Sequence, residues 1–232
     1  MKIIELKEVF STQDYIKKYI SEKKEKIFVF AEKQIKGKGR GNRLFYSPVG
    51  GLYFSFYLPD IEDEKHIFLI TSVSAFTFIE EKVKEFNLKP YIRIPNDIMI
   101  NKKKVCGILI EKSENKFICG IGINVNTTFF PSDLKEASSL YLLTGKKFNL
   151  KKFKKDIIEK IEEISSLTYE ALYKRYSENI TISKKIEFLY DNQIFRGVLN
   201  EIKNDFVISV SINDKVLDFP LFEIFNFREI DE

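Results

Sequence analysis

The spacing of apolar residues changes near residue 180, and this change limits the folds that the chain can adopt. Before it, residues 149–178 repeat apolar side chains such as Phe153 and Ile157 at helical spacing, which predicts a helix. Beyond it, apolar and polar residues alternate, which predicts antiparallel strands at 184–190, 193–202, 205–212 and 215–227. We therefore expect one domain in residues 1–180 and a small β-barrel in residues 181–232.

The first 180 residues mix the two patterns. Helices are predicted at residues 10–24 and 66–86. Strands are predicted at residues 2–6, 26–33, 52–58, 91–94, 97–100, 104–112 and 116–126. Because tight turns join several neighbouring strands, the pattern is one of hairpins and differs from a repeating βαβ array. The expected fold is α+β, with a mixed and mainly antiparallel sheet and flanking helices.

Composition argues against several classes of protein. The chain has 232 residues, 44% of them hydrophobic and 31% charged, which is typical of a globular protein with a core. A net charge of +4 is too small to indicate nucleic-acid binding, and no apolar run approaches the roughly 18 residues of a membrane span. Two cysteines and one histidine argue against a disulfide scaffold or a Cys/His zinc site. The start of the chain resembles no secretion signal, so we expect a cytoplasmic protein without a membrane partner.

The segment QIKGKGRGNRLF, residues 34–45, alternates glycine with lysine and arginine. It lacks the glycine spacing and the Lys-Ser/Thr pair of a Walker loop, and asparagine stands where a dinucleotide fingerprint needs its last glycine. It is short and lies between predicted strands, whereas RNA-binding arginine–glycine segments usually repeat in disordered tails. The residues alone leave two interpretations: a solvated surface loop, or a loop whose backbone N–H groups and cations converge on an anion.

Three further stretches, taken together with this loop, resemble the biotin protein ligases. They are FSTQD at 10–14, RIPNDIMINKKKVCGILIE at 93–111 and CGIGINVN at 119–126, in the order and at the spacing of that family. The similarity runs from about residue 4 to residue 143. It implies a class II synthetase-like ligase domain that is followed by a small SH3-like β-barrel at the C-terminus.

The resemblance implies a two-step reaction that uses ATP, Mg²⁺ and biotin. The carboxylate of biotin attacks the α-phosphate of ATP, which gives biotinyl-5′-AMP and pyrophosphate. A lysine of a biotin carboxyl carrier protein, the partner of the enzyme, then attacks the mixed anhydride and releases AMP. Because the first step brings two anions together, the site needs cations and must exclude water.

The resemblance also assigns residues to these steps. Those expected to bind biotin are Ser11, Thr12, Gln34, Gly37, Arg40, Gly107 and Gly122. Those expected to bind ATP or the adenylate are Arg43, Phe45, Asn96, Lys104, Asn124 and Asn126. Arg93, Arg40 and Lys38 are expected to be catalytic. Asp97 is the candidate ligand for Mg²⁺. The structural alternatives are helix capping by Ser11 and Thr12, core packing of Phe45 and simple solvation of Lys104.

Arg93 is the main departure from the family pattern, because it stands where the family has a lysine. Arginine cannot transfer a proton near neutral pH, but it can hold a carboxylate or a phosphate with two parallel hydrogen bonds. We therefore expect Arg93 to act as a charge clamp. Lys38 stands where arginine is usual, and Phe45 and Ile94 replace tryptophans, which weakens any argument from stacking.

Two other functions stay open at this stage: a lipoate or octanoyl ligase or transferase of the same fold, and a non-catalytic protein that binds biotin or its adenylate. The combination of Ser11, Thr12 and Gln34 favours biotin, because neutral donors and acceptors suit its ureido ring. The motifs begin within the first dozen residues, so we expect no helix-turn-helix and no specific DNA binding. The strand after NKKK could pair with a second copy, as family members often do, and so form a homodimer.

Overall fold

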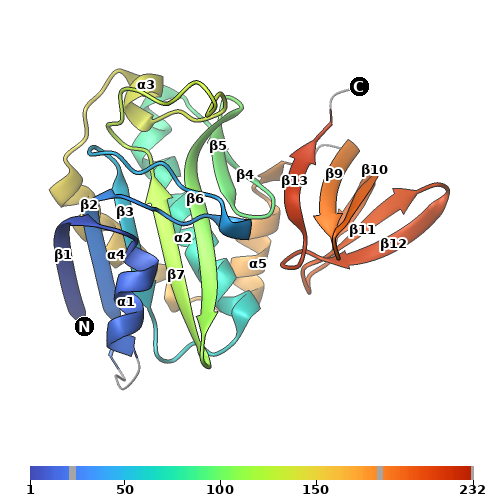
Figure 1. Ribbon diagram of the computed structural model, residues 1–232, viewed down its shortest axis with the longest axis horizontal. Coiled ribbons are helices and arrows are strands. Elements are labelled where there is room, and N and C mark those ends of the chain that lie inside the picture. Colours follow the sequence, from blue (N-terminus) through green and yellow to red (C-terminus); the bar gives the residue numbers. More distant parts are fainter. Residues whose placement is uncertain (21–24, 182–184, 231–232) are drawn as a thin grey trace.

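The structure is a computed structural model that describes residues 1–20, 25–181 and 185–230. Helices pack on a large β-sheet, and a small sheet follows at the C-terminus (Figure 1). The strands of the large sheet are β1 (Lys2–Val9), β2 (Ile27–Gln34), β3 (Leu52–Tyr57), β4 (Pro90–Arg93), β5 (Asp97–Ile100), β6 (Lys103–Ser113), β7 (Lys116–Ile123) and β8 (Ile180–Thr181). They lie in the order β1-β2-β3-β7-β6-β5-β4-β8. Pairing is parallel between β1 and β2 and between β4 and β8, and antiparallel elsewhere, which confirms the predicted fold class.

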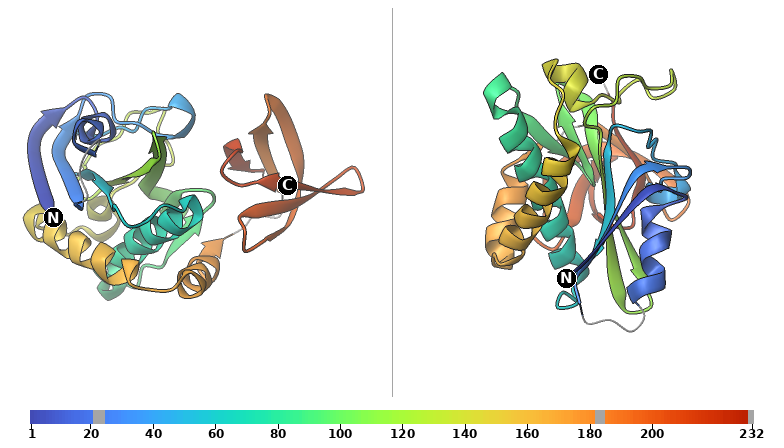
Figure 2. Two further views of the ribbon diagram at one scale, coloured as in Figure 1. Left: turned by 90° about the horizontal axis from the view of Figure 1, so that it is seen from below. Right: turned by 90° about the vertical axis from the view of Figure 1, so that its left-hand side faces the viewer.

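Helices cover both faces of the large sheet (Figure 2). On one face, α2 (Glu64–Val83) packs against the sheet and against α4 (Leu150–Ser165) and α5 (Tyr169–Ser177), while α1 (Thr12–Ile20) covers the other face. Helix α2 is buried on all sides over most of its length, because its apolar residues are not confined to one stripe. Among the described residues, no helix is both long enough and apolar enough to span a membrane.

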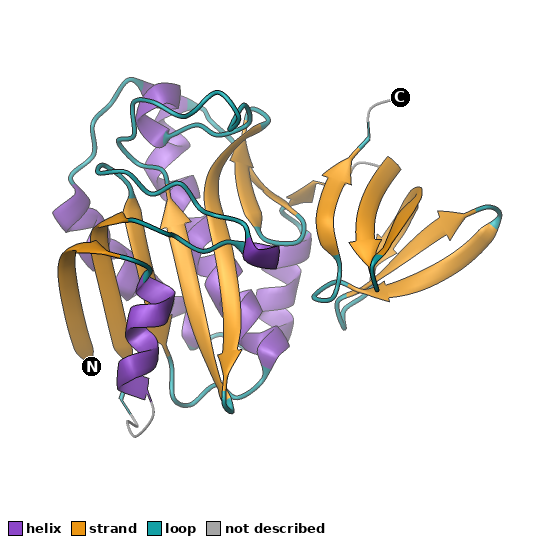
Figure 3. Ribbon diagram, viewed as in Figure 1, coloured by secondary structure: helices purple, strands orange, loops and turns teal. Residues whose placement is uncertain are grey.

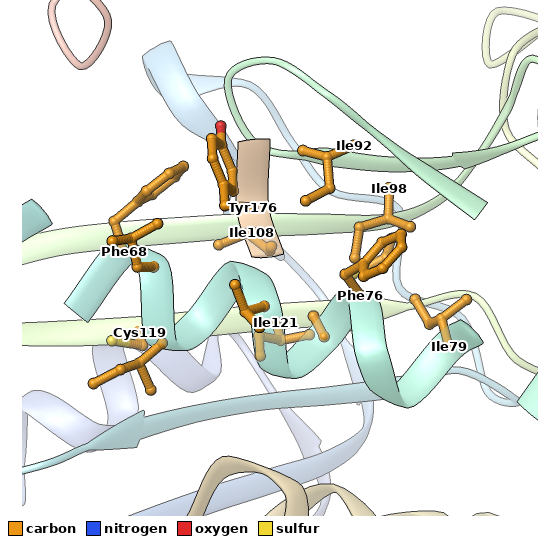
Figure 4. Packing of buried hydrophobic residues seen from close by; sticks show 14 of the residues in the cluster. Phe68, Phe76, Ile79, Ile92, Ile98, Ile108, Cys119, Ile121 and Tyr176 are labelled. Carbon is orange, nitrogen blue, oxygen red and sulfur yellow. The ribbon is translucent and has the colours of Figure 1, made fainter. Parts of the chain in front are cut away.

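Alternate side chains along a strand point to opposite faces of the large sheet. In β2, Phe28 and Phe30 belong to the core under α2, whereas the alternate residues Ile27 and Val29 pack with α1. Strands β6 and β7 send isoleucine and cysteine side chains toward α2, and Figure 4 shows several of these packed with Phe68, Phe76 and Tyr176: Ile108, Cys119 and Ile121. The opposite face of β6 and β7 does not take part in this packing with α2.

Two long connections lie at the same end of the large sheet (Figure 3). The first, residues 35–51, joins β2 to β3 and contains the glycine loop and the short 3₁₀ turn η1 (Arg40–Asn42). The second, residues 124–139, follows β7 and leads to the short helix α3 (Leu140–Thr144). The backbone N–H of Asn126 donates to the carbonyl oxygen of Gly50 at 2.7 Å, so a hydrogen bond joins the two connections.

The small sheet fits the predicted SH3-like fold, but its described strands do not form a closed barrel. Its strands are β9 (Lys185–Tyr190), β10 (Gln193–Ile202), β11 (Val207–Ile212), β12 (Lys215–Pro220) and β13 (Phe225–Glu229), in the order β12-β11-β10-β9-β13. The edge strands β12 and β13 are not paired with each other in the part of the chain that the structure describes, so this SH3-like unit is open. The predicted strand 215–227 is broken because Leu221 and Ile224 turn into the core between β12 and β13.

Other element boundaries also differ from prediction. The predicted helix 149–178 is two helices, α4 and α5, because Thr168 begins α5 by accepting a hydrogen bond from the backbone N–H of Ala171 at 3.3 Å. The predicted helix 10–24 is confirmed as α1, but residues 21–24 lie outside the described residues. The expected division near residue 180 stays a prediction; β8 ends the large sheet there, and residues 182–184 are likewise not described.

The buried environment of α2 can be tested at Phe78, whose ring lies 5.1 Å from that of Phe153. We expect Phe78→Ala to lower the free energy of unfolding by about 3–5 kcal/mol, because the deletion leaves a cavity. Phe129→Ala deletes the same side chain at a position that is 69% exposed. This substitution should change the free energy of unfolding by less than about 0.5 kcal/mol. Urea denaturation measures both; equal losses would contradict the packing of α2.

Candidate functional site

A pocket lies on the α1 face of the large sheet, over strands β6 and β7. Gly107 and Gly122 pair directly across the two strands, and Gly120 lies two residues away on the same face. We call these three residues the glycine floor. A Cβ added to Gly122 would lie 2.6 Å from the ring of Phe45, and one added to Gly120 would lie 3.1 Å from the side chain of Gln13. A Cβ at position 122 would therefore collide with Phe45 and one at position 120 would press on Gln13, because both side chains rest directly on the backbone.

Neutral polar side chains line the pocket where α1 begins. The Oε1 atom of Gln34 accepts hydrogen bonds from the backbone N–H and the hydroxyl of Thr12, at 2.8 and 3.0 Å. Since this uses the hydroxyl proton of Thr12, Ser55 is the donor in the 2.8 Å contact between the two hydroxyls. The Nε2 group of Gln34 donates to Ser47 Oγ at 3.0 Å. We call this cluster the neutral end of the pocket.

Two polar atoms beside this cluster have no hydrogen-bond partner among the described residues. They are Ser11 Oγ and Gln13 Oε1, and both are buried. Helix capping therefore explains neither Ser11 nor Thr12, whose hydroxyl is bonded to Gln34 and Ser55. Because buried polar atoms are nearly always hydrogen-bonded, the unpartnered oxygen of Gln13, which lines the pocket, is a candidate for contact with a ligand, and Ser11 lies close to it in the sequence.

Four charged side chains form a chain that begins with Lys104 and Asp97 in the lining of the pocket and continues outside it. Lys104 Nζ lies 2.6 Å from Asp97 Oδ1, and Arg93 donates to Asp97 Oδ2 at 2.9 Å and to Glu136 at 2.7 Å. Burial alone would raise the pKa of Asp97, but Lys104 and Arg93 outweigh it and hold this pKa below its usual range. Burial opposes the charge of Arg93 as well, yet the two carboxylates raise its pKa. Lys104 also lies 5.7 Å from the centre of the Phe45 ring.

The geometry around Asp97 does not fit its predicted role as a Mg²⁺ ligand. Each carboxylate oxygen of Asp97 already faces a cation within 3 Å, and these cations would repel a metal ion. Within the ranges that the structure describes, no group of three or more Asp, Glu, His and Cys side chains could hold a metal. The more direct reading is that Asp97 orients Lys104 and Arg93.

The glycine loop is held from two sides. Lys38 Nζ lies 2.5 Å from Asp14 of α1 and 3.7 Å from Glu111 of β6. On the other side, the guanidinium group of Arg40 donates to the carbonyl oxygens of Phe222 and Ile224, at 3.0 and 2.9 Å. The loop thus links α1 to the segment between β12 and β13 of the small sheet.

Arg40 and Arg43 differ from the other cations of the pocket because neither has a carboxylate partner among the described residues. Burial, with a smaller contribution from the positive charge of Arg43, lowers the pKa of Arg40 to about 10. The two carbonyl oxygens accept hydrogen bonds from Nη2 of Arg40 without neutralising its charge. An anion bound beside this pair would be stabilised by both.

The structure brings most of the predicted site residues together. The pocket is lined by Thr12, Gln34, Lys38, Arg40, Arg43, Phe45, Asn96, Asp97, Lys104, Gly107 and Gly122. Asn96 also fixes its turn by donating to the carbonyl oxygen of Ile108 at 2.5 Å. Phe45 both packs on the glycine floor and faces the pocket, so packing and a role in binding are compatible.

Five predicted residues lie outside the lining. Gly37 and Arg93 line neighbouring pockets, and Ser11 is buried. Asn124 donates to the carbonyl oxygen of Ser138 at 3.0 Å, and Asn126 exchanges two hydrogen bonds of 2.9 Å with the backbone of Phe148. These two asparagines therefore hold the connection after β7, and the structure does not bring their side chains to the pocket.

Sequence reasoning missed four side chains around the pocket. Gln13 and Asp14 belong to the FSTQD stretch and Glu111 ends RIPNDIMINKKKVCGILIE, so their motifs contained a signal. Glu136, the partner of Arg93, lies in the connection after β7, where no pattern marks it.

The family model for biotin/lipoate A/B protein ligases matches residues 6–127, which is more than half of the chain and includes most of the pocket. The chain belongs to this family. The bifunctional ligase/repressor BirA of Bacillus subtilis is 39% identical over 133 residues, which cover 52% of this ligase-family chain and 40% of that protein. Biotin–protein ligase 1, chloroplastic, of Arabidopsis thaliana is 34% identical over 125 residues, which cover 50% of the chain and 34% of the relative. The match thus spans well under half the length of either relative.

The similarity to solved structures extends over nearly the whole of this chain. A biotin protein ligase from Aquifex aeolicus, in complex with biotin and ATP, superposes with a TM-score of 0.85 at 27% identity, and the match covers 99% of both chains. A biotin protein ligase from Leishmania major in complex with biotinyl-5-AMP has a TM-score of 0.68 at 21% identity, over 94% of this chain and 98% of that one, which supports the fold alone. Both the large sheet and the open SH3-like sheet are therefore features of a known architecture.

The carboxylate of Asp97 should make the free energy of unfolding of this chain depend on pH in the acid range. Its folded-state pKa lies below the unfolded value near 3.8, so in acid the unfolded chain binds more protons. The stabilisation is present above the unfolded pKa and is lost as the pH falls through the folded one. From about pH 5 to about pH 2, the free energy of unfolding of wild type should therefore fall more steeply than that of Asp97→Asn. Urea denaturation across this range measures the difference, and Asp133→Asn, at an exposed position, is the control that should follow wild type.

Proposed function

We propose that this chain is a biotin–protein ligase, which activates biotin as biotinyl-5′-AMP and transfers it to a lysine of a biotin carboxyl carrier protein. The observation that carries the proposal is the polarity of the pocket. Neutral donors and acceptors gather around Thr12 and Gln34, whereas cations gather around Lys104 and Arg40. Biotin has a matching polarity, with a neutral ureido ring at one end and a carboxylate at the other.

The neutral end suits the ureido ring because it offers both kinds of hydrogen-bonding group. Gln13 Oε1 is a buried acceptor without a partner among the described residues, and it can receive an N–H of the ring. The hydroxyl of Ser11, equally unpartnered in that part of the chain, can serve as a donor to the ureido oxygen after a small shift. Leu109 and Phe45 provide apolar contacts for the rest of the molecule.

The cationic end suits the first chemical step. The biotin carboxylate attacks the α-phosphate of ATP, the bond to the β-phosphate oxygen breaks, and pyrophosphate leaves. Lys104, Arg40 and Arg43 line this end of the pocket, and their positive charges would stabilise the negative charge of the reacting groups. Mg²⁺ would arrive with the phosphates of ATP, which commonly supply several of its oxygen ligands. In the second step a neutral lysine amine of the carrier attacks the acyl carbon, AMP leaves, and the amine loses a proton.

Arg93 already donates from Nη1 to Glu136 and from Nη2 to Asp97, so a clamp that uses these two groups must exchange one of its present partners. Glu136 is the candidate for this exchange, because its side chain is 67% exposed while that of Asp97 is 15% exposed. An exposed ion pair is weaker than a partly buried one, so a phosphate oxygen would displace Glu136 first. Lys38 has a different part in the proposal: its charge is compensated by Asp14 and Glu111, so it secures the loop to α1.

Biotin-dependent exchange of labelled pyrophosphate into ATP tests the proposal directly. We expect wild type to catalyse exchange and Lys104→Met to lose about 100-fold in rate, because one charge that stabilises the transition state is removed. Lys135→Met, at an exposed position, is the matched control and should retain the wild-type rate.

Other outcomes of the exchange assay identify the alternatives. Exchange that requires lipoate or octanoate and ignores biotin would replace the proposal with another activity of the same family. Binding of biotin and ATP without any exchange would identify a non-catalytic binding protein. If exchange occurs, transfer to a purified carrier domain, followed by mass spectrometry of its lysine, completes the test.

Substitutions of Arg93 test whether this residue acts as a charge clamp or as a proton-transfer group. In single-turnover adenylation we expect Arg93→Lys to remain within about tenfold of wild type and Arg93→Ala to lose about 100-fold, since only the second removes the charge. The wild-type rate should also stay level between about pH 7 and pH 9, because guanidinium does not titrate there. An alanine variant as fast as wild type would show that Arg93 takes no part in the reaction.

A further inference from the structure

Strand β6 places the carboxylate of Glu111 on the α1 face of the large sheet, beside the pocket. Glu111 lies in the same row of alternating side chains as Gly107 and Leu109, both of which line the pocket. Across the strands it pairs with Ile118 of β7. Glu111 itself lies outside the lining, and Gln13 is the lining residue to which it is hydrogen-bonded. A role of Glu111 in ligand binding would therefore pass through Gln13.

The partners of Gln13 allow its amide only one orientation. The Nε2 group donates to Glu111 Oε2 at 3.2 Å and to the carbonyl oxygen of Ile118 at 3.4 Å. Since an ionised carboxylate and a carbonyl can only accept hydrogen bonds, the reversed amide would place oxygen against oxygen at both contacts. The amide oxygen Oε1 therefore points away from these partners. It is buried and has no partner among the described residues.

The two bonds to this amide differ in strength. The bond to Ile118 is long and ends on a neutral acceptor, whereas the bond to Glu111 is charge-assisted. Packing adds a further constraint, because a Cβ on Gly120 would lie 3.1 Å from Cδ and 3.2 Å from Oε1 of Gln13. The amide thus rests on the strand backbone, and Glu111 is the main determinant of the direction in which Oε1 points.

Two lysines hold the carboxylate of Glu111 in its position. Lys17 of α1 lies 3.4 Å from Oε2, and Lys38 of the glycine loop lies 3.7 Å from Oε1. Both lysines also contact Asp14, at 3.4 and 2.5 Å. Each oxygen of Glu111 therefore has a cation beside it, which keeps Oε2 turned toward Gln13. The same contacts allow a different role, in which Glu111 only anchors Lys38 and the glycine loop.

We propose that Glu111 is a positioning residue for the ureido ring of biotin: it fixes the amide of Gln13 so that Oε1 accepts an N–H of the ring. The inference rests on the proposed function for the identity of the ligand. It also accounts for selectivity, because a ligand with an acceptor at this place would face the same amide oxygen and leave it unpaired. Glu111 and Gln13 together therefore select a hydrogen-bond donor.

The substitution Glu111→Met removes the acceptor and keeps a side chain of similar length. We expect the Kd for biotin, measured by calorimetric titration, to rise about tenfold, because the amide of Gln13 is then free to turn over. Glu111→Gln keeps an acceptor of the same shape without the charge, and its Kd should rise only about threefold. Glu62→Met makes the same change as the first variant at an exposed position and should match wild type.

A double-mutant cycle with Gln13→Met distinguishes positioning from anchoring of the loop. In the Gln13→Met background there is no amide to orient, so adding Glu111→Met should weaken biotin binding no further. A loss of about tenfold in both backgrounds, with thermal stability equal to that of the parent proteins, would overturn the proposal. Glu111 would then act on biotin without Gln13.

The exchange assay separates this inference from the proposed function. Wild type that binds biotin with the expected coupling but exchanges no pyrophosphate would overturn the ligase activity and keep the role of Glu111. Wild type that is an active ligase, with independent effects of the two substitutions, would keep the activity and overturn the role of Glu111. Wild type that binds no biotin would overturn both.

Discussion

The pocket exists because strands β6 and β7 distribute side-chain volume unevenly between their two faces. One face presents isoleucine and cysteine side chains to α2 and is part of the largest core cluster. The other presents Gly107, Gly120 and Gly122, so Gln13 and Phe45 can rest on the backbone itself. A strand that is densely packed on one face keeps its position without side chains on the other. The rigidity of the site is therefore supplied by the core beneath it.

Electrostatic partners give the cations of the pocket distinct tasks. Lys104 and Arg93 share Asp97, which fixes their direction at one end of the pocket. Lys38 is compensated by Asp14 and Glu111, whereas Arg40 is held by carbonyl oxygens that leave its charge available. Residues that look alike in the sequence QIKGKGRGNRLF thus differ in what they can offer a ligand. Their partners, and not their residue types, decide this difference.

Local patterns in the sequence predicted most of the fold and part of the site. Helix α2 and the strands could be recognised because their apolar residues follow regular periods, and the residues around the glycine floor lie within contiguous motifs. The break between β12 and β13 could not be recognised, because its apolar residues turn into a core formed by distant elements. The bonds from Arg40 to the carbonyl oxygens of Phe222 and Ile224 were equally hidden, since a backbone acceptor leaves no mark in the sequence. Glu136 was missed because a single acidic residue in a long connection has no periodic context.

The two attachments of the glycine loop respond differently to dissolved ions. The contact of Lys38 with Asp14 joins two partly exposed charges, and salt screens such charges over about 8 Å at physiological ionic strength. The contact of Arg40 with two carbonyl oxygens is a pair of largely buried hydrogen bonds, which salt affects far less. Rising ionic strength therefore loosens the loop from α1 while the small sheet retains it. Charge therefore holds the side of the loop next to α1, whereas hydrogen bonds that depend far less on salt hold the side next to the small sheet.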